Sequence, residues 1–252
     1  ALNRKTPVGE VTLGRYLVAG SVVLVAAIGL VIALFVPRRP AADAAARFPW
    51  TGPIDTIREL WRTRKDRLLA TVIAADCVVW FVAVLQSLSV NTLGRDQLGL
   101  TEAGTSYLLV AELGGVALGG LLAGWLATGD RWHRVLVPGF FLLALPMAGI
   151  AFVVPTVPAT YQPYVAAGLL LLGGVPGGVL LVPLESFFQV RPAPEKKGAV
   201  IAAANFAGFF AMALAGLGFN ALDELLEPST GFLAIGVLCA VTGAGVAWAL
   251  SR

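Results

Sequence analysis

The sequence predicts an all-helical membrane protein with seven transmembrane helices. Of its 252 residues, 58% are hydrophobic and only 13% are charged, whereas ordinary globular chains carry about 25% charged residues. Seven apolar stretches are each close to the roughly 20 residues that a helix needs to cross a hydrocarbon core. Strands of a membrane barrel would instead alternate in polarity over about ten residues. The composition excludes a disordered chain, a collagen-like repeat and a cytosolic enzyme.

Short polar connections separate the expected spans, with one exception. The spans run from Leu17 to Val36, Leu68 to Val90, Gly104 to Thr128, Val135 to Val154, Tyr164 to Gln189, Gly198 to Asn220 and Thr230 to Leu250. The exception is the loop from Pro37 to Asp66, in which Ile54, Ile57 and Trp61 recur at near-helical spacing among charged residues. This pattern predicts an amphipathic helix, which either lies on the membrane face or packs on the bundle as a solvated helix.

Basic residues collect on one side of the expected bundle. The loop after the first span contains Arg38, Arg39, Arg47, Arg58, Arg62, Arg64, Lys65 and Arg67, and later loops on that side contain Arg131, Arg134, Arg191, Lys196 and Lys197. The opposite loops contain Arg95 as well as the acids Asp223, Glu224 and Glu227. Only the basic residues Arg4, Lys5 and Arg15, before the first span, depart from this pattern. Because short basic loops stay in the cytoplasm, we expect a multi-pass membrane protein with a cytoplasmic carboxy terminus. This topology explains the pI of about 9.1 without a nucleic-acid partner.

Three carboxylic acids lie inside the expected spans: Asp76, Glu112 and Glu185. Charge in the hydrocarbon costs about 2.5 to 3.5 kcal/mol, so such residues are candidates for a substrate-binding or coupling site. No span contains lysine or arginine. The acids must therefore be protonated, hydrated in a cavity, or matched by a cation from the substrate or from another part of the protein. The alternatives are a satisfied structural carboxyl for Asp76 and Glu112, and an ion pair with a loop arginine for Glu185.

Amides and glycines add to this candidate site. Gln86, Gln189 and Asn205 either contribute to binding or make ordinary interhelical hydrogen bonds. The third and fifth spans are rich in glycine, which predicts close helix contacts in either a static or a moving bundle. The first, fourth and seventh spans contain no charge, so we expect them to face lipid while the other four face protein or water.

Several segments resemble the major facilitator superfamily. Gly120, Gly124, Asp130, Arg131 and Arg134 are similar to the signature loop that follows the second helix of each half. More specific is the run of sequence GGVPGG, VPLESFFQ and GAVIAAAN, which covers residues 173–178, 182–189 and 198–205. This run resembles the penultimate region of the lysophospholipid transporters of that superfamily. One departure is Glu185, which stands where those transporters usually have asparagine.

The resemblance implies a domain organisation. The spans would be helices six to twelve of a twelve-helix transporter, so we expect the chain to be a piece of a longer one. Residues 1–36 would be the last helix of the amino-terminal half with its preceding outer loop, 37–66 the cytoplasmic loop between halves, and 67–252 the carboxy-terminal six-helix bundle. In the superfamily, the first helix of each three-helix repeat lines the central cavity, and here these helices contain Asp76 and Glu185.

The resemblance also implies a function. Lysophospholipid transporters move lysophosphatidylethanolamine to the inner leaflet of the bacterial inner membrane for re-acylation, and some are fused to an acyltransferase. The resemblance therefore implies that localisation, and the expected partners are membrane lipids, this substrate, the missing amino-terminal half and such an acyltransferase domain. Acyltransferase chemistry needs a histidine four residues before an aspartate, but the only histidine, His133, is followed at that distance by Val137. We therefore expect no catalytic residue, cofactor or metal site in this segment.

Three other functions stay open at this point. A proton-coupled exporter of drugs or small metabolites would share the fold but not the substrate. A seven-helix receptor or retinal protein fits the span count, although no span offers a lysine for a Schiff base. A membrane scaffold without transport activity is the third alternative.

Overall fold

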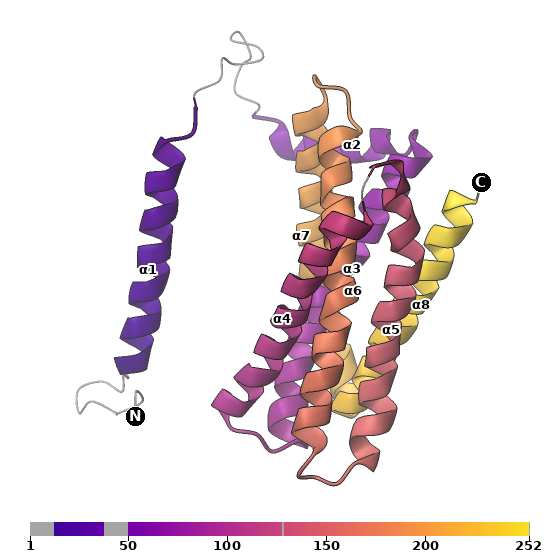
Figure 1. The fold of residues 1–252 in the computed structure, drawn as a ribbon. Coiled ribbons are helices and arrows are strands. Elements are labelled where there is room, and N and C mark those ends of the chain that lie inside the picture. The colour runs from indigo at the N-terminus through magenta and orange to yellow at the C-terminus, as the bar shows by residue number, and fades with distance from the viewer. Residues whose placement is uncertain (1–12, 38–49, 128, 252) are drawn as a thin grey trace. The chain divides into compact units, whose positions relative to one another are not determined.

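The structure, a computed structural model, describes residues 13–37, 50–127 and 129–251. Within these ranges the chain is helical apart from short connections (Figure 1). The long helices are α1 (Leu13–Leu34), α2 (Gly52–Thr63), α3 (Arg67–Thr92), α4 (Glu102–Leu126), α5 (Leu136–Val153), α6 (Gln162–Val190), α7 (Lys197–Leu225) and α8 (Pro228–Leu250). Short helical turns over Leu93–Gln97, Gly129–Val135 and Val154–Thr156 connect some of them. The chain divides into two units, Ala1–Phe48 and Pro49–Arg252.

The predicted fold class is confirmed. Seven helices of the described ranges, all except α2, are long and apolar enough to cross a membrane. Their ends agree with the expected spans within a few residues, except that α7 continues from Asn220 to Leu225. No proline or glycine interrupts the chain there, so the helix takes in residues that were expected in a loop, and Pro228 begins α8.

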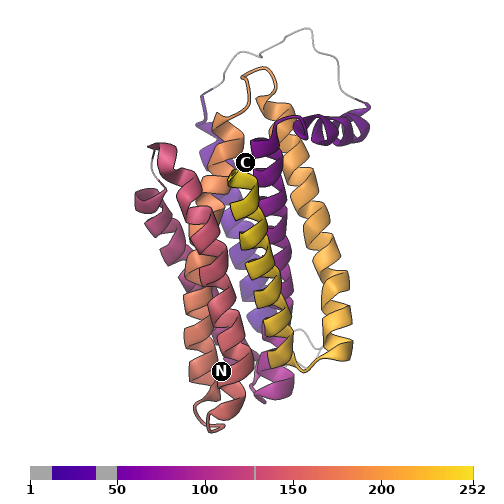
Figure 2. The same cartoon turned by 90° about the vertical axis from the view of Figure 1, so that its right-hand side faces the viewer.

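The six helices α3 to α8 form one bundle (Figures 1 and 2). In it α4 packs along α6, α5 packs against α6 and α8, and α3 packs against α7 and α8. The expectation that the charge-free fourth span faces lipid is wrong in part, because a larger share of α5 than of α4 is buried. Phe140, Met147 and Ile150 of α5 are completely enclosed. Burial in this bundle depends on how apolar side chains fit between helices. The number of charged residues in a span therefore does not predict how much of the span is buried.

Glycines set the contact between α4 and α6. A Cβ atom built on Gly115 of α4 would overlap the backbone carbonyl oxygen of Leu171, and one built on Gly174 of α6 would overlap that of Glu112. Gly119 and Gly178, one turn further along each helix, are equally tight against the opposite backbone. Because small residues at four-residue spacing let two backbones approach closely, this contact depends on the absence of side chains.

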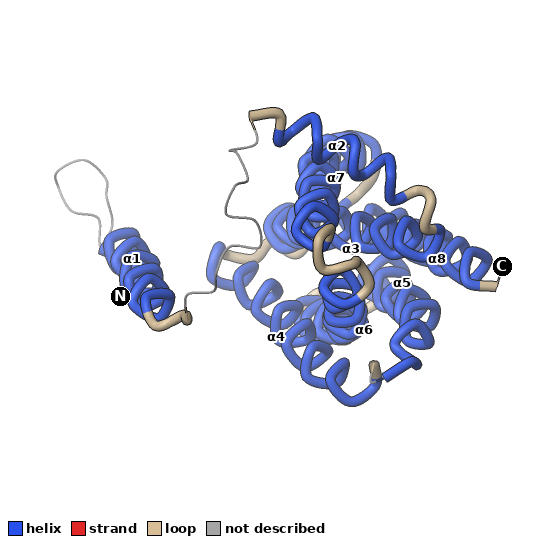
Figure 3. Tube along the Cα trace, turned by 90° about the horizontal axis from the view of Figure 1, so that it is seen from above, coloured by secondary structure: helices blue, strands red, loops and turns tan. Residues whose placement is uncertain are grey.

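The amphipathic helix α2 lies across one end of the bundle, beside α7 and α3 (Figures 2 and 3). Its apolar stripe is exposed: Ile54 by 60%, Ile57 by 45% and Trp61 by 64%. The side that meets the bundle carries Thr63, which is buried, and Leu60, which packs against the apolar core. The stripe therefore faces away from the bundle, which favours the membrane-surface interpretation over a solvated helix whose apolar face packs inward.

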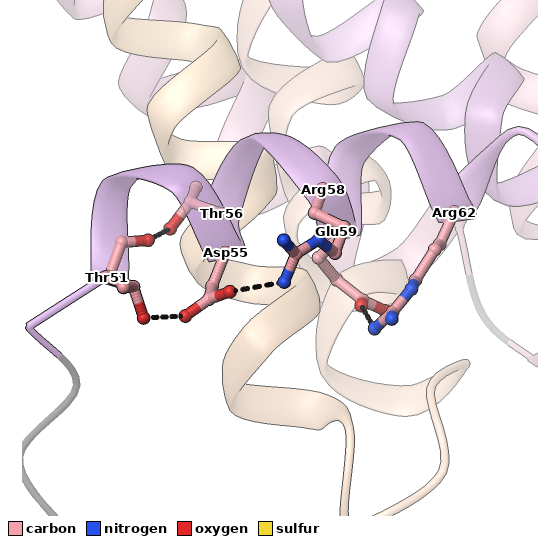
Figure 4. A network of polar contacts seen from close by, with 7 residues as sticks. Thr51, Asp55, Thr56, Arg58, Glu59 and Arg62 are labelled. Carbon is pink, nitrogen blue, oxygen red and sulfur yellow. Dashed lines mark hydrogen bonds and ion pairs between the residues drawn. The ribbon is translucent and has the colours of Figure 1, made fainter.

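Polar contacts within α2 stabilise the helix itself (Figure 4). The Thr51 hydroxyl donates a hydrogen bond to the Asp55 carboxylate at 2.6 Å, and Arg58 pairs with the same carboxylate at 2.9 Å. One turn later Arg62 pairs with Glu59 at 3.3 Å. The two ion pairs span three residues and the hydrogen bond spans four, so all of them join neighbouring turns and add modestly to the stability of the helix.

The two ends of the bundle differ in charge. The end that carries α2, the starts of α3, α5 and α7 and the end of α6 has the described basic residues Arg58, Arg62, Arg64, Lys65, Arg67, Arg134, Arg191, Lys196 and Lys197. The opposite end has one base, Arg95, and the acids Asp96, Glu102, Asp223, Glu224 and Glu227. Other charged residues used in the topology argument lie outside the described residues, namely Arg4, Lys5, Arg38, Arg39, Arg47 and the side chain of Arg131. The charge separation holds, and the cytoplasmic assignment of the basic end stays a prediction.

Candidate functional site

Asp76 lies deep in the bundle, between α3 and α7. It is nine residues after Arg67, which is about 14 Å along the helix, and only 3% of it is exposed. A Cβ atom on Gly208 of α7 would lie 3.9 Å from its Oδ2 atom and 3.5 Å from Trp80, so this glycine leaves room for both side chains. The Oδ1 atom has no hydrogen-bond partner among the described residues. Asp76 also interacts electrostatically with Glu185 of α6.

Glu112 and Gln86 share a second, separate position. They line a cavity of about 50 Å³ between α3, α4, α5 and α6, whose other walls include Gly173, Gly174 and Gly177. Glu112 is 7% exposed and Gln86 is 3% exposed, and Oε2 of the first and Nε2 of the second have no partner in the described chain. Apart from these two side chains the cavity walls are almost entirely apolar, and the volume is large enough for one water molecule that would bridge Glu112 and Gln86.

The two buried acids do not form one site. Asp76 does not line the cavity of Glu112. Gln86 follows Asp76 by ten residues, about 15 Å along α3, so the two positions lie at different depths of the bundle. Both carboxyls are buried within this bundle.

The expected ion pair of Glu185 is not formed among the described residues. Glu185 is half-buried, and among the described residues Arg191 pairs with Asp66 instead, at 3.2 Å. Asp66 is the amino-terminal cap of α3 and accepts a hydrogen bond from the backbone N–H of Leu69 at 3.1 Å. Partial burial raises the pKa of Asp66, but the Leu69 hydrogen bond and the Arg191 guanidinium outweigh it and hold that pKa below its usual value. Arg191 thus joins the end of α6 to the start of α3.

Gln189 and Asn205 are exposed, and the interhelical hydrogen bonds expected for them are absent from the described residues. Sequence reasoning missed further exposed polar residues within the spans, which include Ser87 and Asn91 of α3, Ser186 of α6 and Asn220 of α7. Ser87 and Asn91 are four residues apart, and Ser186 and Gln189 are three apart, so each pair lies on one face of its helix. A helical projection of each span would have found these faces. Lipid solvates such groups poorly, so they mark faces that meet water or protein.

The loop residues of the family resemblance are only partly described. Gly120 is half-buried and Gly124 exposed, and neither has an atom close to where its Cβ would be. The side chains of Asp130 and Arg131 lie outside the described residues, and Arg134 is exposed. The close glycine contacts of α4 are thus made at other positions.

An apolar pocket of about 350 Å³ opens at the basic end of α6. Its lining residues are Ala127, Trp132, Val182, Pro183, Ser186, Phe187, Val190 and Arg191. The Trp132 and Phe187 rings pack against each other with centroids 4.7 Å apart. The pocket combines apolar and aromatic walls with one cation, an arrangement that suits an amphiphilic molecule with an anionic group.

In the described part of the chain, no group of three or more histidine, cysteine, aspartate or glutamate side chains could hold a metal ion. Cys77 and Cys239 are free thiols. The buried carboxyls of Asp76 and Glu112 can bind protons and accept hydrogen bonds.

Comparison with known proteins gives one match. Residues 12–216 match the sequence model of the family described as Major Facilitator Superfamily. No curated protein and no solved structure matches the chain. The matched range covers α1 to α6 and most of α7, including the buried acids, the glycine contact and the apolar pocket.

Proposed function

The chain belongs to the major facilitator superfamily, which makes it a multi-pass membrane transporter, and we propose that its substrate is a lysophospholipid such as lysophosphatidylethanolamine. In this proposal the substrate crosses the bacterial inner membrane by alternating access and is then re-acylated. Residues 67–252 supply one half of the carrier, α1 ends the other half, and any acyltransferase lies elsewhere in the full-length protein.

One observation supports the lipid substrate most directly. The segment VPLESFFQ, which resembles lysophospholipid transporters, supplies Val182, Pro183, Ser186 and Phe187 to the wall of the apolar pocket. Arg191, at the edge of that segment, contributes the cation and also pairs with Asp66 at 3.2 Å. A lysophospholipid has one acyl chain and one phosphate, and this pocket offers a complementary surface to each.

The substrate assignment can be tested by filling this pocket with a large side chain. In proteoliposomes, the full-length protein should import labelled lysophosphatidylethanolamine, and Ser186→Trp should slow the import by about tenfold because the indole occupies the space of a ligand. Leu172→Trp, at a 58% exposed position of the same helix, is the matched control and should import at the wild-type rate. Absence of import by the wild type, or equal import by the two variants, would count against the lysophospholipid assignment.

A second candidate is proton-coupled export of a drug or small metabolite. The observation that favours it is the burial of Asp76 and Glu112 without a cation among the described residues, since such carboxyls bind and release protons more readily than they hold a fixed charge. Flux that follows a pH gradient and ignores lysolipid would support this candidate. The superfamily membership leaves the receptor and scaffold alternatives without a supporting observation.

A further inference from the structure

A cleft at the basic end of the bundle adjoins the apolar pocket at Arg191 and is separate from the buried acids. It has a volume of about 470 Å³ and lies between the end of α2, the start of α3, the residues after α6 and the start of α7. Its charged lining residues are Glu59, Arg62, Lys65, Asp66, Arg191 and Lys196. Leu69 and Val200, both buried in the apolar core, also line it.

The charges of this cleft favour an anion. Both acids are already paired, Glu59 with Arg62 at 3.3 Å and Asp66 with Arg191 at 3.2 Å. Lys65 and Lys196 form no ion pair within the described ranges, which leaves the cleft with two uncompensated positive charges. Both lysines are exposed and can turn toward a ligand at low cost. A phosphate group could take hydrogen bonds from the two ammonium groups and from the guanidinium groups of the arginines.

The surface beside the cleft indicates where the phosphate comes from. Helix α2, which forms one wall, exposes Ile54, Ile57 and Trp61 on the side away from the bundle. The guanidinium carbon of Arg64 lies 4.1 Å from the centre of a Trp61 ring, so a cation sits against an aromatic group at the edge of this stripe. An apolar stripe bordered by basic residues lies at the level of lipid headgroups, with its apolar side among the acyl chains.

We propose that this cleft binds the phosphate headgroup of an anionic phospholipid from the leaflet in which α2 lies. The headgroup phosphate contacts Lys65 and Lys196, and the apolar floor at Leu69 and Val200 meets the start of the acyl chains. Clusters of basic residues between helices at a membrane surface are suited to such headgroups. The ligand ties α2, α3 and α7 together and does not depend on the substrate that the carrier moves.

The test measures which lipid the full-length protein retains. The protein is inserted into nanodiscs with equal amounts of phosphatidylglycerol and phosphatidylcholine, and native mass spectrometry then gives the ratio of the two bound lipids. The wild type should prefer phosphatidylglycerol, and the double variant Lys65→Gln with Lys196→Gln should lose about tenfold of that preference. The variant Lys65→Arg with Lys196→Arg should keep it.

A matched control removes the same charge nearby. Arg58→Gln with Lys197→Gln changes two exposed bases of the same end that do not line the cleft, and this variant should keep the wild-type preference. Equal retention of both lipids by the wild type would overturn the proposal, as would an equal loss in the two neutralised variants.

A further measurement distinguishes a bound lipid from a bound free anion. Trp61→Gln should weaken phosphatidylglycerol retention because it removes the membrane contact of α2, and millimolar inorganic phosphate should not displace the lipid. If inorganic phosphate competes fully and Trp61→Gln has no effect, the cleft is a site for free phosphate and the lipid assignment is wrong.

Discussion

Gly115→Ala should strongly destabilise the bundle, although it adds a single carbon atom. The new Cβ would overlap the carbonyl oxygen of Leu171, and a backbone atom cannot move aside as a side-chain end can. Helices α4 and α6 would have to separate along their whole contact. We expect a loss of stability at the upper end of the roughly 1 to 3 kcal/mol that overpacking costs, seen as a lower midpoint of thermal unfolding in detergent.

The neighbouring residue supplies the control for this prediction. Gly114 is exposed, and no atom lies within 4 Å of where its Cβ would be. Alanine is favoured over glycine inside a helix by about 1 kcal/mol, so Gly114→Ala should leave the midpoint unchanged or raise it. Equal midpoints for the two variants would show that the glycine contact between α4 and α6 does not hold the bundle together.

Asp76→Asn should slow transport by about tenfold or more and remove its dependence on a pH gradient. Asparagine keeps the shape of the side chain but can no longer gain or lose a proton. Burying a charge at this depth costs about 2.5 to 3.5 kcal/mol, enough to shift a conformational equilibrium by roughly 100-fold when the group titrates. The measurement is initial flux in proteoliposomes at several internal pH values.

Asp96→Asn is the matched control for Asp76→Asn. Asp96 lies in the helical turn after α3, at the acidic end of the bundle, and its substitution should leave the pH profile unchanged. The fold of both variants can be compared by thermal unfolding, in which Asp76→Asn should be at least as stable as the wild type because it removes a buried acid. A normal rate and pH profile in Asp76→Asn would remove Asp76 from the transport mechanism.

Much of the fold could be predicted because a membrane imposes simple rules. The hydrocarbon thickness fixes the length of a span, and the requirement for internal backbone hydrogen bonds leaves the helix as the form of a single span. These rules located all seven long apolar helices, and glycine spacing indicated close packing in α4 and α6. They did not identify which glycines make the contact, because Gly114 and Gly115 look alike until the rotation of α4 is known.

The candidate site was less predictable, because side-chain partners depend on how helices are rotated. Sequence position grouped Asp76 and Glu112 as one kind of residue, yet they lie in two separate places, and Gln86 joins only the second. Glu185 was expected to pair with a loop arginine, but Asp66 takes Arg191 because the cap of α3 meets the end of α6. Periodicity reports the direction of a side chain along its own helix and leaves its neighbours undetermined.

The apolar face of α2, in contrast, was predicted correctly from the spacing of its residues. The spacing of Ile54, Ile57 and Trp61 gave the stripe correctly but left two environments open. Contact with the bundle through Leu60 and Thr63 turns the stripe away from the bundle, which favours the membrane-surface environment. That placement stays a prediction.

The central claim is that the exposed polar faces of this bundle line a water-filled passage, which a second bundle completes. Thiol labelling of Asn205→Cys in the full-length protein tests it most directly, with Cys77→Ser and Cys239→Ala in the background. Asn205 is exposed eight residues into α7, about 12 Å from its start, while Phe210, 60% exposed, points to another side of the same helix. A membrane-impermeant thiol reagent should modify Asn205→Cys, more slowly when substrate is present, and should leave Phe210→Cys unmodified. If Asn205→Cys is as inert as Phe210→Cys with and without substrate, that face meets no water and the claim is contradicted.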